Sequence, residues 1–214
     1  MLQFISAGKR HGMRWAPLRC NLKVVPGETV WLSGPPGSGK SVLVRMGLGV
    51  VAPDSGSVLV NDTNIARAAH GVRQKIRRTV SAVLDDEPPV AVPAVDWLAT
   101  GLWCAGRPWG RCVKSAKEAI DGFGLGADAA HPLNGLGRET RFAFQLARAL
   151  GREPKLIMID WAGAFAAPVP VPVLDAMLRF VAEGGACLVI GAMTDTVARL
   201  GGRQAVLDPP GQAV

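Results

Sequence analysis

The residues best suited to chemistry form one short segment near the start of the chain. Residues 34 to 41 read Gly-Pro-Pro-Gly-Ser-Gly-Lys-Ser and fit the G-x-x-x-x-G-K-[ST] pattern of a phosphate-binding loop. Glycines let backbone N–H groups close around phosphate oxygens, and a following helix adds partial positive charge at its N-terminus. In this pattern Lys40 reaches the β- and γ-phosphates of a nucleotide, and the Ser41 hydroxyl binds Mg²⁺. We therefore predict a nucleotide site made by Gly34, Pro35, Pro36, Gly37, Ser38, Gly39, Lys40 and Ser41.

The flanking residues predict the elements that this loop needs. An apolar run over residues 28–33 precedes it and predicts a strand, and an apolar-periodic stretch over residues 42–46 predicts a helix after it. A glycine-rich turn that binds nothing is the alternative. Because both the consensus and its context are intact, nucleotide binding is the stronger interpretation.

Composition predicts one globular α/β domain, residues 1–214, with room for a modest subdomain, since 49% of the residues are hydrophobic and 19% are charged. No targeting segment is recognised, and Asp160 and three prolines interrupt the longest apolar stretch, residues 156–174, so no membrane span is expected. The four cysteines have neither zinc-ligand nor Cys-x-x-Cys spacing and are predicted to be free or buried thiols, which favours a cytoplasmic setting; they are Cys20, Cys104, Cys112 and Cys187.

The formal charge of +7 raises the question of a nucleic acid or membrane partner. The Lys and Arg residues are scattered, however, and the chain has only twelve aromatic residues and no Tyr. Without a visible stacking platform, no nucleic acid partner is expected. A solvated basic surface is the simpler interpretation, and contact with a membrane partner stays open.

Further segments extend the pattern along the chain. A strand, a turn and a second strand are predicted over residues 23–34, and a turn followed by a strand over 52–60. Another strand is predicted over residues 75–84. Residues 146–150 end a helix, and residues 155–160 form a buried strand that ends in an acid. This order resembles the ATP-binding subunits of ABC transporters over nearly the whole chain. Within them it is most similar to the cell-division, lipoprotein-release and macrolide-export group, which often carries an Arg-Arg pair where Arg77-Arg78 stand here.

Spacing agrees with the resemblance. Lys40 and Asp160 are 120 residues apart, which leaves room for an inserted helical subdomain at about 87–140. The resemblance implies an α/β fold: a P-loop NTPase core with an added antiparallel β subdomain and an inserted helical subdomain. It also implies ATP and Mg²⁺ as ligands, an integral membrane subunit as partner, and a peripheral position on the inner face of the cell membrane.

The family pattern assigns roles to two further residues. His11 stands where the family places an aromatic side chain that stacks on adenine; an ordinary surface loop residue is an equally open interpretation. Asp160 matches the Walker B aspartate, whose carboxylate would orient Mg²⁺ through water.

Two expected catalytic residues are replaced. Trp161 occupies the place of the glutamate that polarises the attacking water, and an indole has no basic site. The switch histidine should follow the strand at 187–190, but residues 191–195 read Gly-Ala-Met-Thr-Asp, and the only histidines are His11, His70 and His131.

Two partner-facing segments are also altered. Asp85, followed by Asp86 and Glu87, stands where the family has a glutamine that links the γ-phosphate to the membrane partner; it is a candidate Mg²⁺ ligand, or part of a solvated acidic turn. The signature Leu-Ser-Gly-Gly-Gln corresponds to residues 136–140, Leu-Gly-Arg-Glu-Thr, with residues 133–137 as a competing register.

Together these features predict an ATP-binding subunit with degenerate catalytic motifs and weak or absent hydrolysis, paired with a membrane subunit and a second ATPase subunit. One alternative is an active ATPase completed by a partner or by acids such as Asp85. Another is a small-molecule kinase, for which the segment Arg107–Arg111 would be a poor phosphate-binding lid.

Overall fold

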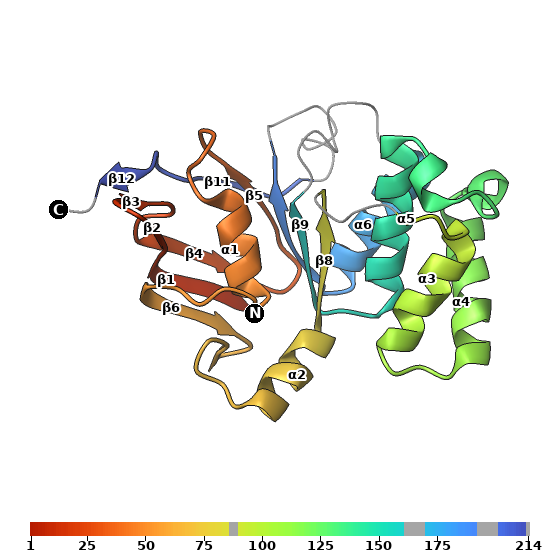
Figure 1. The fold of residues 1–214 in the computed structure, drawn as a ribbon, viewed down its shortest axis with the longest axis horizontal. Helices are drawn as coiled ribbons and strands as arrows, with labels where there is room; N and C mark the ends of the chain where they lie inside the picture. Colours follow the sequence, from red (N-terminus) through yellow and green to blue (C-terminus); the bar gives the residue numbers. More distant parts are fainter. Residues whose placement is uncertain (86–89, 161–169, 192–200, 213–214) are drawn as a thin grey trace.

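The computed structural model describes residues 1–85, 90–160, 170–191 and 201–212 (Figure 1). At its centre lies a five-stranded parallel sheet in the order β11-β5-β10-β9-β8. Strands β9 and β10 are buried almost throughout, as expected for parallel strands covered on both faces. The strands are β5 (Thr29–Ser33), β8 (Val80–Leu84), β9 (Leu156–Asp160), β10 (Ala186–Ile190) and β11 (Arg203–Val206).

A second sheet is antiparallel, in the order β4-β1-β6-β7, and lies at the left in Figure 1. Its strand β4 alternates buried and exposed side chains, so one face packs on the core and the other meets solvent. The strands are β1 (Leu2–Gly8), β4 (Cys20–Val24), β6 (Ser55–Val60) and β7 (Thr63–Asn64). A third, small sheet in the order β12-β3-β2 joins β2 (Arg10–His11), β3 (Arg14–Trp15) and β12 (Gly211–Gln212).

Six α-helices are found in the described part of the chain: α1 (Lys40–Gly47), α2 (His70–Arg78), α3 (Ala94–Cys104), α4 (Trp109–Gly122), α5 (Arg138–Gly151) and α6 (Val171–Ala182). Single 3₁₀ turns cover Gly126–Asp128 and Leu133–Gly135. Helices α3 and α4 form a separate lobe at the right of Figure 1. No helix within the described ranges has the length and apolar character that a bilayer-spanning segment needs.

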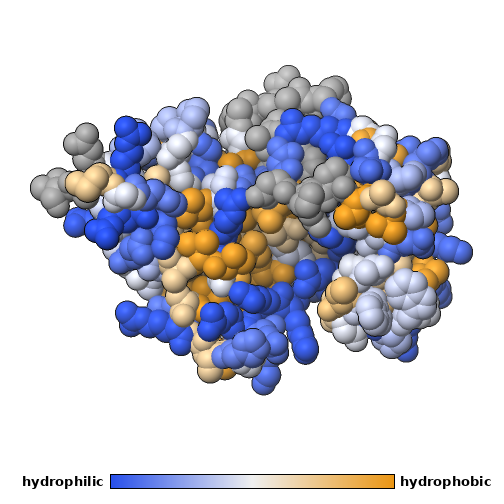
Figure 2. Space-filling view, viewed as in Figure 1, coloured by the Kyte–Doolittle hydropathy of each residue, from blue (hydrophilic) through white to orange (hydrophobic). Residues whose placement is uncertain are grey.

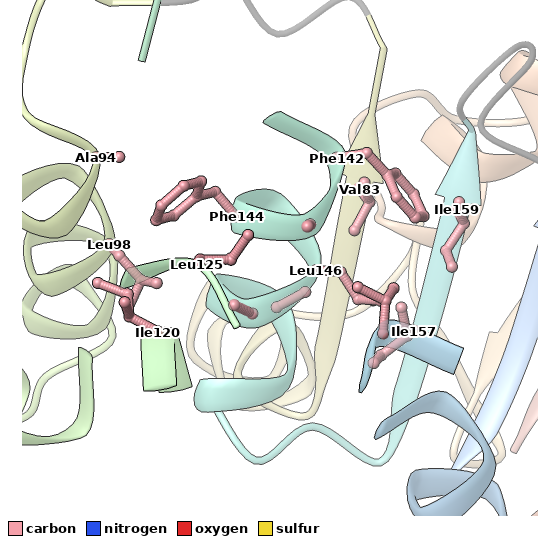
Figure 3. Close-up of a cluster of buried hydrophobic side chains, with 14 of the residues drawn as sticks. Val83, Ala94, Leu98, Ile120, Leu125, Phe142, Phe144, Leu146, Ile157 and Ile159 are labelled. Atoms are coloured by element: carbon pink, nitrogen blue, oxygen red, sulfur yellow. The ribbon is translucent and has the colours of Figure 1, made fainter. Parts of the chain in front are cut away.

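Two hydrophobic clusters hold the layers together. One lies between the antiparallel sheet, α1 and one face of the parallel sheet, and Phe4 and Leu43 are among its fully buried members. The other joins the opposite face of the parallel sheet to the helical lobe through α5 (Figure 3). There, Leu146 packs toward the sheet and Phe144 toward α3 and α4, so α5 physically couples the lobe to the strands. In Figure 2, hydrophilic side chains surround a group of hydrophobic ones near the middle of the face.

One predicted element is wrong in part. Residues 75–84 are not a single strand, because residues 75–78 end helix α2 and the strand begins only at Val80. Three cationic side chains in the last turn of α2 stabilise the helix, because the end of a helix dipole at the C-terminus is negative. The Arg77 guanidinium also donates to the carbonyls of Leu48 (3.2 Å) and Gly49 (2.8 Å), which fixes α2 against the end of α1.

The other predicted strands are present. Strands β4 and β5 flank the turn at Pro26-Gly27, β6 follows the turn after Ala52, and β9 ends in Asp160. All four cysteines are free, and only Cys104 is exposed. The α/β architecture therefore has the three parts that were predicted: a parallel core, an antiparallel sheet and an added helical lobe.

Candidate nucleotide-binding site

The phosphate-binding loop connects β5 to α1, which begins at Lys40. Gly39 caps this helix with φ 92° and ψ 18°, a left-handed conformation. A Cβ atom on Gly39 would lie 2.3 Å from both the carbonyl carbon of Ala16 and the nitrogen of Pro17. Only glycine fits at this position, because any side chain would be strained and would overlap backbone.

Lys40 is held inside the loop. Its Nζ donates to the carbonyl oxygens of Gly34 (2.8 Å) and Pro35 (2.9 Å) and lies 3.4 Å from the Ser38 hydroxyl oxygen. Burial lowers the pKa of the Lys40 ammonium, and the nearby Asp160 carboxylate acts in the opposite direction. The loop cation is thus held by loop carbonyls and lies within electrostatic range of the acid that ends β9.

The loop opens onto a cavity of about 440 Å³, within the range of sizes usual for small-ligand sites. The structure brings His11 to this cavity together with the loop and the start of α1. No acidic side chain is found among the described residues that line it. The lining residues are His11, Arg14, Ala16, Pro36, Gly37, Gly39, Lys40, Ser41, Val42 and Pro210.

The candidate metal ligands lie at the same edge of the parallel sheet. Asp160 ends β9, Ser41 stands in the first turn of α1, and Asp160 is close enough to Lys40 to affect its pKa. Among the described residues there is no group of three or more His, Cys, Asp or Glu side chains that could hold a metal. A hydroxyl and one carboxylate suit Mg²⁺ only when phosphate and water oxygens complete its shell.

Asp85 pairs with a basic side chain. Its backbone N–H donates to the Asp160 carbonyl oxygen at 2.9 Å, but its carboxylate forms an ion pair with Arg138. Both side chains are partly exposed, at 33% for Asp85 and 45% for Arg138. Arg138 is the first residue of α5, so the segment Leu136–Thr140 straddles the start of that helix. The metal role of Asp85 stays a prediction.

Some predicted features lie outside the described residues: Trp161, the acids Asp86 and Glu87, and residues 192–195. One residue that lines the cavity, Arg14, was not predicted from the sequence. A signal was available, since His11 and Arg14 are separated by two residues, the spacing of a tight hairpin that sets two side chains on one face.

Comparisons with known proteins bear on this geometry. A sequence profile of the family described as ABC transporter matches residues 18–162. The chain is 28% identical over 191 residues to the methionine import ATP-binding protein MetN of Brucella abortus, covering 88% of this chain and 52% of that protein. It thus spans about half the length of these methionine-import relatives. It is 31% identical to the lipoprotein-releasing system ATP-binding protein LolD 2 of Caulobacter vibrioides, covering 84% of this chain and 80% of that protein.

Solved structures agree on the fold. An ATP-binding cassette solved as a dimer in a post-hydrolysis state bound to ADP and Pi superposes with a TM-score of 0.84 at 22% identity, covering 99% of this chain and 98% of that one. A nucleotide-free cassette from an ABC transporter gives 0.79 at 19% identity, covering 100% of this chain and 92% of that one. The predicted fold class is confirmed, and the chain belongs to the ABC transporter family.

Proposed function

We propose that this chain is the ATP-binding subunit of a membrane transport complex and that it holds ATP-Mg²⁺ without hydrolysing it efficiently. The observation that carries the proposal is the cavity that opens at the phosphate loop, with Lys40 and Ser41 in its wall and Asp160 within electrostatic range of Lys40. A loop cation, a helix N-terminus and a metal-orienting carboxylate are the groups that a triphosphate needs. The names of the relatives, which are ATP-binding proteins of import and release systems, support the transport assignment.

Weak hydrolysis follows from residue chemistry. Trp161 offers no base to the attacking water, and no histidine follows the strand that ends at Ile190. Loss of a general base typically lowers a rate by about 10²–10⁴-fold. Loss of charge-stabilising donors lowers it further, and such groups act as a unit rather than additively.

The alternatives find less support. An active ATPase that uses Asp85 as a substitute base would need this carboxylate near the γ-phosphate, whereas it is paired with Arg138 at the start of α5. A kinase lid would bring arginines over the loop. Arg107 lies instead in the turn between α3 and α4 of the helical lobe. It pairs there with Glu153, which follows α5, at 2.8 Å.

We further propose a membrane subunit and a second ATPase subunit as partners, at the inner face of the membrane. The cassette's own signature segment, with Arg138 at the start of α5, carries Glu139 where the family has glycine. In a homodimer this acid would face the γ-phosphate at both sites, an unfavourable contact in a partly desolvated cleft. Light scattering with ATP-Mg²⁺ tests this idea, because a stable ATP-dependent homodimer would contradict it.

We also propose that residues of about 87–140 are one insertion into the core. The support is that the two ends of this segment meet. The Ala94 N–H donates to the His131 carbonyl at 2.9 Å, and the Leu133 N–H donates to the Val92 carbonyl at 3.0 Å. Hydrogen exchange in which α3 and α4 open as a unit separate from β8 and β9 would support the insertion, and exchange at one common rate would count against it.

The nucleotide site is tested by Lys40→Ala. Removal of a charge-assisted contact is worth about 1.5–3 kcal/mol, so ATP-Mg²⁺ affinity should fall about tenfold to a hundredfold. Calorimetric titration of the folded variant measures this loss directly. Lys117→Ala, on the exposed side of α4, is the matched control and should leave affinity unchanged. Equal affinity of wild type and Lys40→Ala would show that the nucleotide is not bound at this loop.

A further inference from the structure

The hairpin ahead of the phosphate loop has two distinct faces. Strands β2 and β3 pair antiparallel, with His11 opposite Arg14 and Arg10 opposite Trp15, around a turn in which Gly12 has φ 61°. Because side chains alternate along a strand, directly opposed residues share one face of a hairpin. His11 and Arg14 therefore project from one face, and Arg10 and Trp15 from the other.

The cavities agree with this division. His11 and Arg14 line the cavity of about 440 Å³ at the phosphate loop. Arg10 and Trp15 line a different hollow of about 570 Å³, together with Lys9 and Asp54. The face that carries His11 and Arg14 is thus the one turned toward the loop.

The base of the hairpin is fixed in place. The Ala16 N–H donates to the Lys9 carbonyl at 2.9 Å, and the Lys9 N–H donates to the Pro17 carbonyl at 3.0 Å. Strand β12 also pairs with β3, and Pro210, just before β12, lines the same cavity. The backbone that carries His11 and Arg14 is therefore fixed both at the base of the hairpin and by strand β12.

The charges of the two faces differ. On the Arg10 face, Asp54 accepts from the Lys9 ammonium at 3.0 Å and from the Arg10 backbone N–H at 2.8 Å, and these bonds lower its pKa. On the other face, no acidic side chain within the described ranges pairs with Arg14. Arg14 is exposed and lines the cavity, so its guanidinium, which has no acidic partner in the described part of the chain, can meet a ligand there.

We propose that Arg14 binds the nucleotide base, with its guanidinium beside the His11 imidazole as a two-part platform on which the base lies. The inference rests on the proposed nucleotide site, and it names a contact that this site needs. Imidazole offers less stacking surface than Tyr or Trp, and this chain has no Tyr at all. A guanidinium is planar and stacks on aromatic rings with a cation–π contribution, so Arg14 supplies the surface that His11 lacks.

Two probes separate a base contact from a phosphate contact. ATP-Mg²⁺ carries both groups, whereas Mg²⁺-tripolyphosphate carries the phosphates alone. Calorimetry with Arg14→Ala should show ATP affinity lowered about threefold to thirtyfold and tripolyphosphate affinity within about twofold of wild type. Arg14→Gln should behave like Arg14→Ala toward ATP, because the amide is planar but uncharged and shorter.

Arg10→Ala is the matched control, since it removes the same guanidinium from the opposite face of the hairpin and should leave both affinities unchanged. Equal weakening of ATP and tripolyphosphate in Arg14→Ala would overturn the proposal, because Arg14 would then act on the phosphates. Unchanged ATP affinity would overturn it as well. If wild type and Lys40→Ala bound ATP equally, the nucleotide site itself would fail, a result distinguishable from both.

Discussion

Two regions at the same edge of the parallel sheet are built in opposite ways. At the phosphate loop, the cations of Lys40 and Arg14 stand at the wall of an open cavity, and no described lining residue is acidic. At the end of β8, the acid and the cation of Asp85 and Arg138 face each other and form an ion pair within the chain. In the first region the two cations line an open cavity, and in the second the acid and the cation pair with each other.

The difference separates binding from turnover. A loop that holds phosphates in the ground state contributes affinity, whereas acceleration needs groups that act more strongly in the transition state. The segments that the family resemblance assigns to the γ-phosphate and to a partner contain Asp85 and Arg138 in this chain, and these two side chains pair with each other. Under the proposed function, a chain built this way would keep nucleotide recognition while hydrolysis is weak.

The largest effect is expected from Gly39→Ala, which places a side chain in the phosphate-binding loop. The new Cβ meets backbone at 2.3 Å, and the left-handed conformation adds about 1–3 kcal/mol of strain. The melting temperature should fall by at least about 3–6 °C, and ATP affinity by tenfold or more. Scanning calorimetry and titration measure both quantities.

Gly37→Ala is the control for backbone strain alone. Gly37 has φ 77°, but among the described residues the nearest atom that a Cβ there would meet is the Pro210 Cγ at 4.0 Å. The smaller loss should therefore occur in Gly37→Ala. Equal losses in the two variants would mean that the close approach of residues 16–17 to the loop is not structurally important.

A smaller effect is expected at the second region. The coupling of Asp85 and Arg138 should be about 0.2–1 kcal/mol in a double-mutant cycle with Asp85→Asn and Arg138→Gln, because both side chains are partly exposed. Urea unfolding at low and high salt measures it, and salt should reduce it. The pair Lys114–Glu118 on α4, at 3.8 Å, is a reference for a fully solvated pair. Zero coupling at low salt would show that the contact does not persist in solution.

Sequence reasoning located the loop, its flanking strand and helix, and the buried strand that ends in Asp160, because each has a local signature in residue type and period. It was wrong at residues 75–78, where apolar residues are sparse: Ile76 is the only buried residue of α2, and tertiary hydrogen bonds from Arg77 fix the helix. The contact between Asp85 and Arg138 spans 53 positions, and no local pattern encodes which distant charge an acid meets. Arg14 was missed for a related reason, since its role depends on which hairpin face turns toward the loop.

The most direct test of the central claim is the chemical state of nucleotide held by the purified chain. The chain is mixed with radiolabelled ATP and Mg²⁺, recovered by rapid filtration over a time course, and the bound nucleotide is separated by chromatography, with Lys40→Ala as the control for binding at the loop. We make the prediction that wild type retains label that Lys40→Ala does not, and that this label stays ATP for minutes. Conversion to ADP at an ordinary enzymatic rate, on the order of 1 s⁻¹ or faster and lost in Lys40→Ala, would contradict it.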